Sequence, residues 1–172
     1  MVFRACVSIC DRDSKMILVT GACGYIGSHT CFELLERGYE VLAIDNFSNG
    51  SRESLFRVEE ITGKGIAFHQ CDVRDRVALR QILRKHAVDA VIHFAGMRAS
   101  AEYTSQPLRY FSVNAGGTIT LLQALSDAGI HHMLYSSSAT MYGGESLPVS
   151  ESARLSVANP YARSKLMAEI VM

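Results

Sequence analysis

The ten residues Thr20–His29, TGACGYIGSH, carry the strongest structural signal in the chain. They follow the apolar run Met16–Val19, which has the length of a strand. Three glycines, Gly21, Gly24 and Gly27, recur in them at intervals of three. A strand that turns tightly into a helix exposes backbone N–H groups at the helix N-terminus, where a phosphate group can bind. The stretch therefore predicts a strand, a phosphate-binding turn and a helix.

Each glycine has its own expected role, although a glycine triplet alone is also compatible with a turn that binds nothing. Gly21 permits the tight turn, Gly24 lets the backbone approach a pyrophosphate, and Gly27 lets the helix pack close to the strand. Asp45 ends the next apolar run, and a carboxylate about 20 residues after such a turn can hold an adenosine ribose. Because this carboxylate would repel the extra phosphate of NADP, the expected cofactor is NAD. The alternative is that Asp45 only caps a loop.

Outward from this turn, apolar runs of strand length alternate with segments of helical period. We expect strands at 16–20, 40–45, 66–72, 90–95 and 132–138, and helices at 25–37, 51–61, 75–86, 107–128 and 160–172. Buried strands that alternate with amphipathic helices indicate a parallel sheet covered on both faces. The sequence therefore predicts an α/β fold: a doubly wound parallel sheet of the Rossmann type, in three layers, over residues 16–172.

The composition is that of an ordinary globular domain. The 172 residues are 48% hydrophobic and 20% charged, which suits one domain. Seventeen basic residues balance 17 acidic ones, so no electrostatic attraction to nucleic acid or to an anionic membrane is expected. No apolar run approaches the roughly 20 residues that cross a bilayer. We expect neither a nucleic-acid nor a membrane partner.

The cysteines favour a reducing compartment. They are odd in number and form no CxxC pair: Cys6, Cys10, Cys23, Cys31 and Cys71. We expect free thiols, a cytoplasmic location and no metal site. Residues 1–15 lack the apolar core of a secretory signal and precede the first strand, so we expect them to form a disordered extension.

Chemically useful residues follow the later strands, where ligands bind to a parallel sheet. Asp72 can accept a hydrogen bond from an adenine amino group, or it can cap the next helix. Ser138 can hydrogen-bond a substrate oxygen. Tyr161 and Lys165 stand at i and i+4, on one face of a helix. This spacing is common in surface pairs, but an ammonium also stabilises a neighbouring phenolate, so Tyr161 can serve as a general base and acid.

Five strings, in this order and spacing, resemble the extended short-chain dehydrogenase/reductase family and, within it, the nucleotide-sugar 4-epimerases: GACGYIGSHTC, DNFSNG, HFAGMRA, SSSATMYGG and PYARSKLMAE. The resemblance covers residues 16–172. It implies a tightly held NAD, a UDP-sugar substrate such as UDP-glucose or UDP-galactose, and a homodimer formed through the helices at 107–128 and 160–172. It also implies that the C-terminal part, with the substrate domain, is absent, so we expect a fragment with little activity alone.

The resemblance assigns roles to individual residues. Tyr161 would be the catalytic base, Lys165 would hold the nicotinamide ribose, and Ser138 would bind the sugar 4-hydroxyl. These three would also touch the cofactor, together with the following residues: Gly21, Gly24, Tyr25, Ile26, Gly27, Asp45, Asn46, Phe47, Ser48, Asn49, Gly50, Asp72, Val73, Phe94, Ala95, Gly96, Met97, Arg98 and Asn114.

Two other functions stay open. One is epimerisation of another nucleotide sugar, such as UDP-glucuronate, UDP-xylose or a UDP-N-acetylhexosamine. The other is a non-catalytic NAD-binding module, against which the joint presence of Ser138, Tyr161 and Lys165 argues. The segment Ser138–Thr140 lacks the acid pair that sugar-nucleotide 4,6-dehydratases carry after the threonine, so dehydration is not expected.

Overall fold

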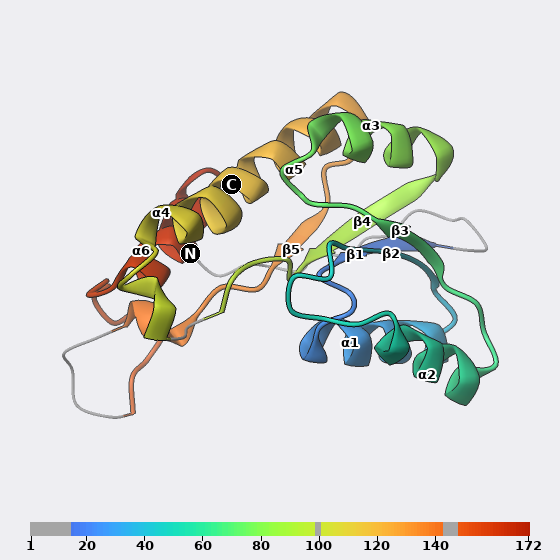
Figure 1. The fold of residues 1–172 in the computed structure, drawn as a ribbon, viewed down its shortest axis with the longest axis horizontal. Coiled ribbons are helices and arrows are strands. Elements are labelled where there is room, and N and C mark those ends of the chain that lie inside the picture. Colours follow the sequence, from blue (N-terminus) through green and yellow to red (C-terminus); the bar gives the residue numbers. More distant parts are fainter. Residues whose placement is uncertain (1–14, 99–100, 143–147) are drawn as a thin grey trace.

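The computed structural model describes residues 15–98, 101–142 and 148–172 (Figure 1). Five parallel strands form one sheet: β1 Met16–Thr20, β2 Glu40–Asp45, β3 Ala67–Gln70, β4 Val88–His93 and β5 Met133–Tyr135. Their order is β3-β2-β1-β4-β5, so the chain moves outward from β1 in both directions. This order confirms the predicted doubly wound sheet. The predicted extension, Lys15 apart, lies outside the described residues.

Two layers of helices cover the sheet (Figure 1). The helices are α1 Tyr25–Glu36, α2 Glu53–Thr62, α3 Arg76–Lys85, α4 Pro107–Tyr110, α5 Gly117–Asp127 and α6 Pro160–Ile170. Alternate residues of β1 serve the two faces, because side chains of a strand point to opposite sides. Ile17 and Val19 pack with residues of α1 and α2, whereas Leu18 packs with residues of α3 and α5. The three predicted layers are therefore confirmed.

The helix expected at 107–128 is interrupted. Between α4 and α5 the segment Phe111–Gly116 is a π-helix, whose wider turn accommodates one additional residue. The buried side chain of Asn114 lies in this turn and bonds to other elements, which the sequence periodicity did not predict. Two strands are also shorter than expected. Residues 71–73 and 136–138 follow β3 and β5 as loops at the ligand-binding edge of the sheet.

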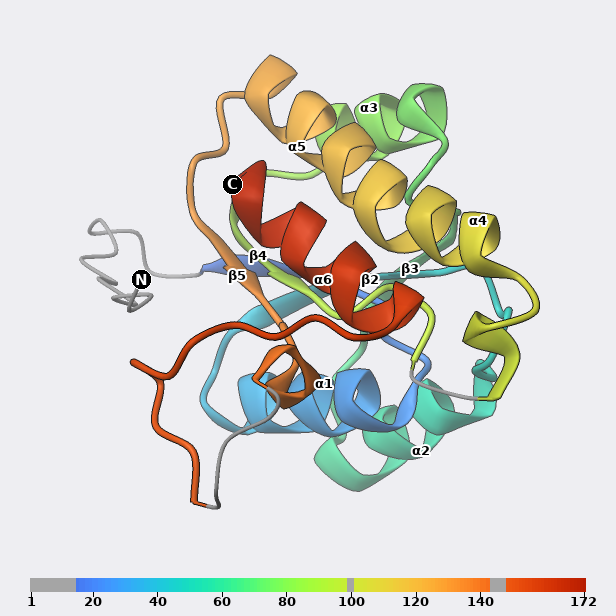
Figure 2. The ribbon, with the colours of Figure 1, turned by 90° about the vertical axis from the view of Figure 1, so that its left-hand side faces the viewer.

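Helix α6 lies against the π-helical segment and the short 3₁₀ helix Ala139–Met141 (Figure 2). Asn159 caps it by accepting a hydrogen bond from the backbone N–H of Ala162, and Pro160 follows at the first turn. These signals begin the helix where the sequence predicted. Within the described residues, no helix is both long and apolar enough to cross a bilayer.

Candidate active site

The glycine turn is shaped by close contacts between backbone segments. Gly21 has a φ of +68°, and a Cβ there would lie 2.7 Å from the backbone nitrogen of Ala95. A Cβ on Gly27 would overlap the carbonyl oxygen of Gly21, so a side chain would push α1 away from β1. Sterically, these two glycines have the roles that the sequence predicted. A Cβ on Gly24 would lie 3.3 Å from the oxygen of Gly21, and its approach to a pyrophosphate stays a prediction.

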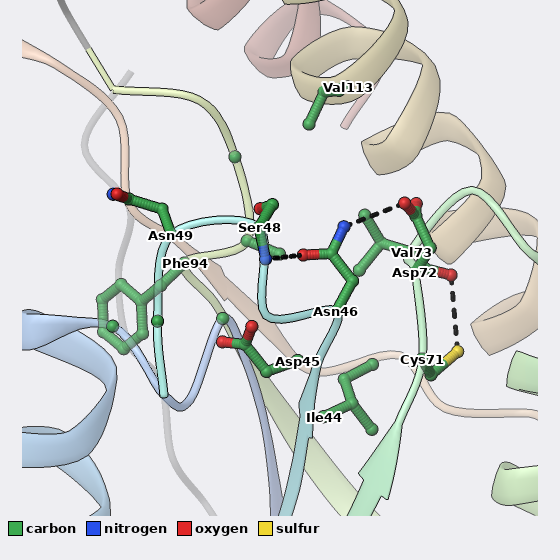
Figure 3. A pocket seen from close by; sticks show the side chains of 15 residues that line it. Ile44, Asp45, Asn46, Ser48, Asn49, Cys71, Asp72, Val73, Phe94 and Val113 are labelled. Atoms are coloured by element: carbon green, nitrogen blue, oxygen red, sulfur yellow. Dashed lines mark hydrogen bonds between the residues drawn. The ribbon is translucent and has the colours of Figure 1, made fainter. Parts of the chain in front are cut away.

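A groove of about 110 Å³ opens beside this turn, at the carboxyl ends of the strands (Figure 3). It is lined by many of the residues predicted to bind the cofactor: Gly21, Gly24, Asp45, Asn46, Ser48, Asn49, Gly50, Asp72, Val73, Phe94, Ala95 and Gly96. The sequence missed three further lining residues, Ile44, Cys71 and Val113. Cys71 and Ile44 adjoin predicted residues, but only the packing of the π-helical segment brings Val113 to the groove.

Asp45 ties the glycine turn to the loop after β2. Its buried carboxylate accepts hydrogen bonds from the N–H groups of Cys23 at 2.9 Å and Phe47 at 2.8 Å. Phe47 takes a φ of +60° and stacks on Phe68, with ring centroids 5.4 Å apart. Asp45 therefore does more than cap its own loop. Because each carboxylate oxygen can accept two hydrogen bonds, capacity for a ribose hydroxyl remains.

Asp72 lines the groove and is hydrogen-bonded by neighbouring residues, and its contact with adenine stays a prediction. Its carboxylate accepts four hydrogen bonds of 2.7–2.9 Å, one from the side chain of Asn46 and three from the backbone and guanidinium of Arg74. The guanidinium is the main cause of a lowered Asp72 pKa. The cap of α3 is Asp75, which accepts from the N–H of Ala78, so the capping alternative is wrong for Asp72. An adenine amino group would have to exchange with one of these four bonds.

Tyr161 and Lys165 lie on α6, as predicted. The ring of Tyr161 meets the buried ring of Tyr110 edge to face, with centroids 6.4 Å apart. Lys165 is only 7% exposed, and its Nζ lies 4.1 Å from the ring centroid of Tyr135. Burial lowers the Lys165 pKa to about 8, while Glu169 acts in the opposite direction. Among the described residues, no hydrogen bond or ion pair satisfies this ammonium, so its donors are available to a ligand.

Ser138 follows β5 and begins the 3₁₀ helix that packs on α6. Its Oγ accepts a hydrogen bond from the N–H of Thr140 at 3.3 Å and lies 2.8 Å from Oγ1 of the same residue. The fold therefore brings the loop of Ser138 against the helix of Tyr161 and Lys165. Their joint action on a substrate stays a prediction.

Asn114 joins the loop after β4 to α6. Its Oδ1 accepts from the N–H of Met97 at 2.7 Å, and its Nδ2 donates to the oxygen of Met97 and to Oγ of Ser164 at 2.9 Å. Ser164 in turn donates to the carbonyl oxygen of Tyr161. The amide of Asn114 therefore links the loop after β4 to the first turn of α6, and its part in a cofactor site stays a prediction.

His93 is a part of the site that the sequence analysis missed. Oγ1 of Thr118 donates its one hydrogen to the carbonyl oxygen of Asn114, so it must accept from Nε2–H of His93 at 3.0 Å. Nδ1 of His93 is then the acceptor for the hydroxyl of Thr20 at 2.6 Å. That hydroxyl oxygen accepts from the N–H of Ala95 at 3.2 Å. The chain of bonds leaves one tautomer, the neutral imidazole with its proton on Nε2.

The electrostatics agree with a neutral imidazole. Complete burial lowers the pKa of His93 to about 3, with a further contribution from the charge of Lys165. The sequence did contain a signal for His93, because it is a lone polar residue in the apolar run AVIHFA, 90–95. A polar residue buried in a strand needs hydrogen-bond partners.

Tyr25, Ile26 and Arg98 are among the predicted cofactor residues that do not line the groove. Tyr25 and Ile26 are 81% and 58% exposed at the first turn of α1. Arg98 is exposed in the segment after β4. The described residues hold no group of three potential metal ligands.

A family model described as the NAD dependent epimerase/dehydratase family matches residues 17–172. The chain belongs to this family. A family member from Bacillus subtilis, UDP-glucose 4-epimerase, is 47% identical over 157 residues, which are 91% of this chain and 46% of the relative. The chain thus spans about half the length of the curated relatives it matches.

Solved structures of the family have the same fold. A UDP-glucose-4-epimerase from Stenotrophomonas maltophila with bound NAD and formylated UDP-arabinopyranose is 42% identical and superposes with a TM-score of 0.88, covering 91% of this chain and 47% of that one. A UDP-glucose 4-epimerase from Bifidobacterium longum in complex with NAD+ and UDP is 39% identical, with a TM-score of 0.88, and the match covers 91% of this chain and 48% of that one. The predicted family and Rossmann-type fold are confirmed.

Proposed function

We propose that the chain forms the NAD-binding and proton-transfer half of a UDP-glucose 4-epimerase. The observation that carries this proposal is the side chain of Lys165, which is 7% exposed and has no hydrogen bond or ion pair among the described residues. It stands one helical turn after Tyr161 and next to the loop of Ser138. A largely buried cation without a protein acceptor is costly in a folded protein, so it is typical of a site that a ligand completes. The similarity to epimerases with bound NAD supports the same conclusion.

The residues present fit NAD along its whole length. The N–H groups of residues 21–24 donate to Ile44, Asp45 and Gly21, so the first turn of α1 would offer its backbone N–H groups to the pyrophosphate. Asp45 has acceptor capacity for the adenosine ribose. The ammonium of Lys165 would bind the hydroxyls of the nicotinamide ribose. When bound, NAD accepts a hydride from the sugar and later returns it.

Tyr161 would take the proton from the sugar 4-hydroxyl and later give it back to the 4-keto sugar. Ser138 would hydrogen-bond the same oxygen and keep it within reach of the phenol. The positive charge of Lys165 would stabilise the phenolate of Tyr161. Asn114, through Ser164, holds the carbonyl of Tyr161, so the base is attached to the loop that faces the cofactor.

A second candidate substrate is another UDP-sugar, because the S. maltophila relative holds a formylated UDP-arabinopyranose.

A cytoplasmic location and a homodimer stay proposals. The free thiols of Cys23, Cys31 and Cys71 agree with the first. Exposed apolar residues on α4 and α6 agree with the second, among them Leu108 at 82% and Ile170 at 73% exposure.

The test is a calorimetric titration of this chain with NAD and with NADP. We expect NAD to bind and NADP to bind at least about tenfold more weakly, because Asp45 repels the 2′-phosphate. Absence of NAD binding, or equal binding of NADP, would overturn the cofactor assignment.

A second experiment uses a form that includes the C-terminal half. There, Tyr161→Phe should abolish conversion of UDP-galactose to UDP-glucose while NAD stays bound. Turnover that survives the substitution would show that Tyr161 is not the catalytic base.

A further inference from the structure

The side chains of Tyr135 and Lys165 meet in the interior between β5 and α6. Nζ of Lys165 lies 4.1 Å from the ring centroid of Tyr135, and each residue is only 7% exposed. The structure gives the ammonium this cation–π contact and, among the described residues, no hydrogen bond or ion pair. Glu169 stands one turn further along α6 and influences Lys165 electrostatically, but no ion pair joins them.

The phenol of Tyr135 stays neutral, so its contribution comes from the aromatic face. Burial raises the pKa of Tyr135 well above its usual value, and the neighbouring Tyr161 and Glu169 add to this effect. A cation within about 6 Å of a ring centroid is attracted to the face of the ring, most strongly where water is excluded. The distance condition holds for Lys165, and its side chain is only 7% exposed.

We propose that Tyr135 is a positioning residue whose aromatic face holds the Lys165 ammonium in place. Its consequence for NAD rests on the proposed function, because there the same ammonium binds the nicotinamide ribose. The titratable groups that interact with Lys165 are His93 on β4, which is neutral, and Glu169 on α6, while Tyr161 and Glu169 interact with Tyr135. The ring therefore supplies a fixed attraction that needs no carboxylate and leaves the N–H donors of Lys165 available to a ligand.

The first test measures the pKa of Lys165 without any ligand. The chain has four lysines, so lysine labelled with ¹³C at the ε carbon gives four signals, and Lys165→Arg assigns the one that matters. Tyr135→Phe keeps the ring and should leave the pKa within about 0.3 of the wild-type value. Tyr135→Leu removes the ring and should lower the pKa by roughly 0.5 to 1.5, because the charged form loses its attraction.

An unchanged or raised pKa in Tyr135→Leu would overturn the proposal, and so would an equal fall in Tyr135→Phe. If Tyr135→Leu does not fold, Tyr135→Met replaces the ring with a long, flexible side chain and is read in the same way. Tyr39→Leu removes a partly buried ring just before β2, which is separated from β5 by β1 and β4, and should leave the Lys165 signal unchanged.

The second test measures NAD affinity of the same variants. Tyr135→Leu should bind NAD about 3- to 10-fold more weakly, and Tyr135→Phe should bind it like the wild type. An equal loss in both variants would show that the hydroxyl acts and the ring does not, which contradicts the proposal. Failure of the wild-type chain to bind NAD would refute the proposed function, while the ligand-free pKa measurement would still decide the role of Tyr135.

Discussion

Nε2–H of His93 donates a hydrogen bond to Oγ1 of Thr118 at 3.0 Å, and this bond connects β4 with the helix that follows the π-helical segment. On its other side, the imidazole accepts from Thr20 at the end of β1. Asn114, whose carbonyl receives the hydroxyl of Thr118, also holds the loop after β4 and α6. The glycine turn and α6 are therefore joined by buried hydrogen bonds that pass through one neutral histidine.

Replacing His93 with leucine should destabilise the chain by about 1–3 kcal/mol. The buried hydroxyl of Thr20 would lose its acceptor, and leaving such a group unsatisfied costs about 1–3 kcal/mol, whereas the hydroxyl of Thr118 would still donate to Asn114. Urea unfolding followed by circular dichroism measures the change. His132→Leu, at an exposed position before β5, is the matched control and should stay within about 0.5 kcal/mol of the wild type. A similar stability for both variants would contradict the role given to His93.

Stability should fall as the solution becomes acidic. The pKa of His93 is about 3 when folded, but near 6.5 when unfolded, so below pH 6.5 the unfolded chain binds a proton that the folded chain does not. The free energy of unfolding should therefore decrease by up to about 1.4 kcal/mol per pH unit below pH 6.5, and this contribution should be constant above it. Urea titrations between pH 7.5 and 5 test this. If His93→Leu retains the full wild-type slope, another group is responsible.

Lys165→Met should make the chain more stable and a poorer binder of NAD. The Lys165 pKa of about 8 lies below the usual 10.5, so at pH 7 the folded chain holds a buried ammonium that would be better solvated when unfolded. As the pH falls from 10.5 to 8, the unfolded chain binds a proton at this lysine before the folded chain does, so the free energy of unfolding decreases. At pH 7 this decrease is complete. We expect a gain of about 1–3 kcal/mol in urea unfolding at pH 7.

Lys85→Met, at the exposed end of α3, is the control for Lys165→Met and should show no comparable gain. A lower urea midpoint for Lys165→Met than for the wild type would mean that the ammonium is stabilised in the fold. In that case Lys165 would not lower the stability of the chain while supporting NAD binding.

Gly27→Ala should be severely destabilising, whereas Gly65→Ala should be tolerated. A Cβ on Gly27 would overlap the backbone of Gly21, which cannot move without opening the turn, and we expect a loss of about 3 kcal/mol or more. A Cβ on Gly65 would meet no atom within 4 Å, and its backbone is not in the left-handed region. Thermal unfolding of the two variants compares them directly. Equal melting temperatures would show that α1 does not depend on this close contact.

The sequence alone determined the alternation of strands and helices, the glycine turn, and the location of Asp45, Tyr161 and Lys165. These features are local. Hydrophobic periodicity sets the type of each element, and glycine, proline and capping residues mark its ends within a few positions. The doubly wound sheet could also be predicted, because right-handed crossovers leave few topologies for alternating strands and helices.

The tertiary structure alone decided how the side chains of the site are held. The four bonds of Asp72, the π-helical turn at Asn114, the neutral tautomer of His93 and the ring of Tyr135 above Lys165 each depend on partners that lie elsewhere in the fold. A polar group buried in the interior must take the hydrogen-bond partners or ring faces that packing brings to it. No spacing along the chain encodes those partners, because residues such as Thr20 and His93, 73 positions apart, become neighbours only when the sheet forms.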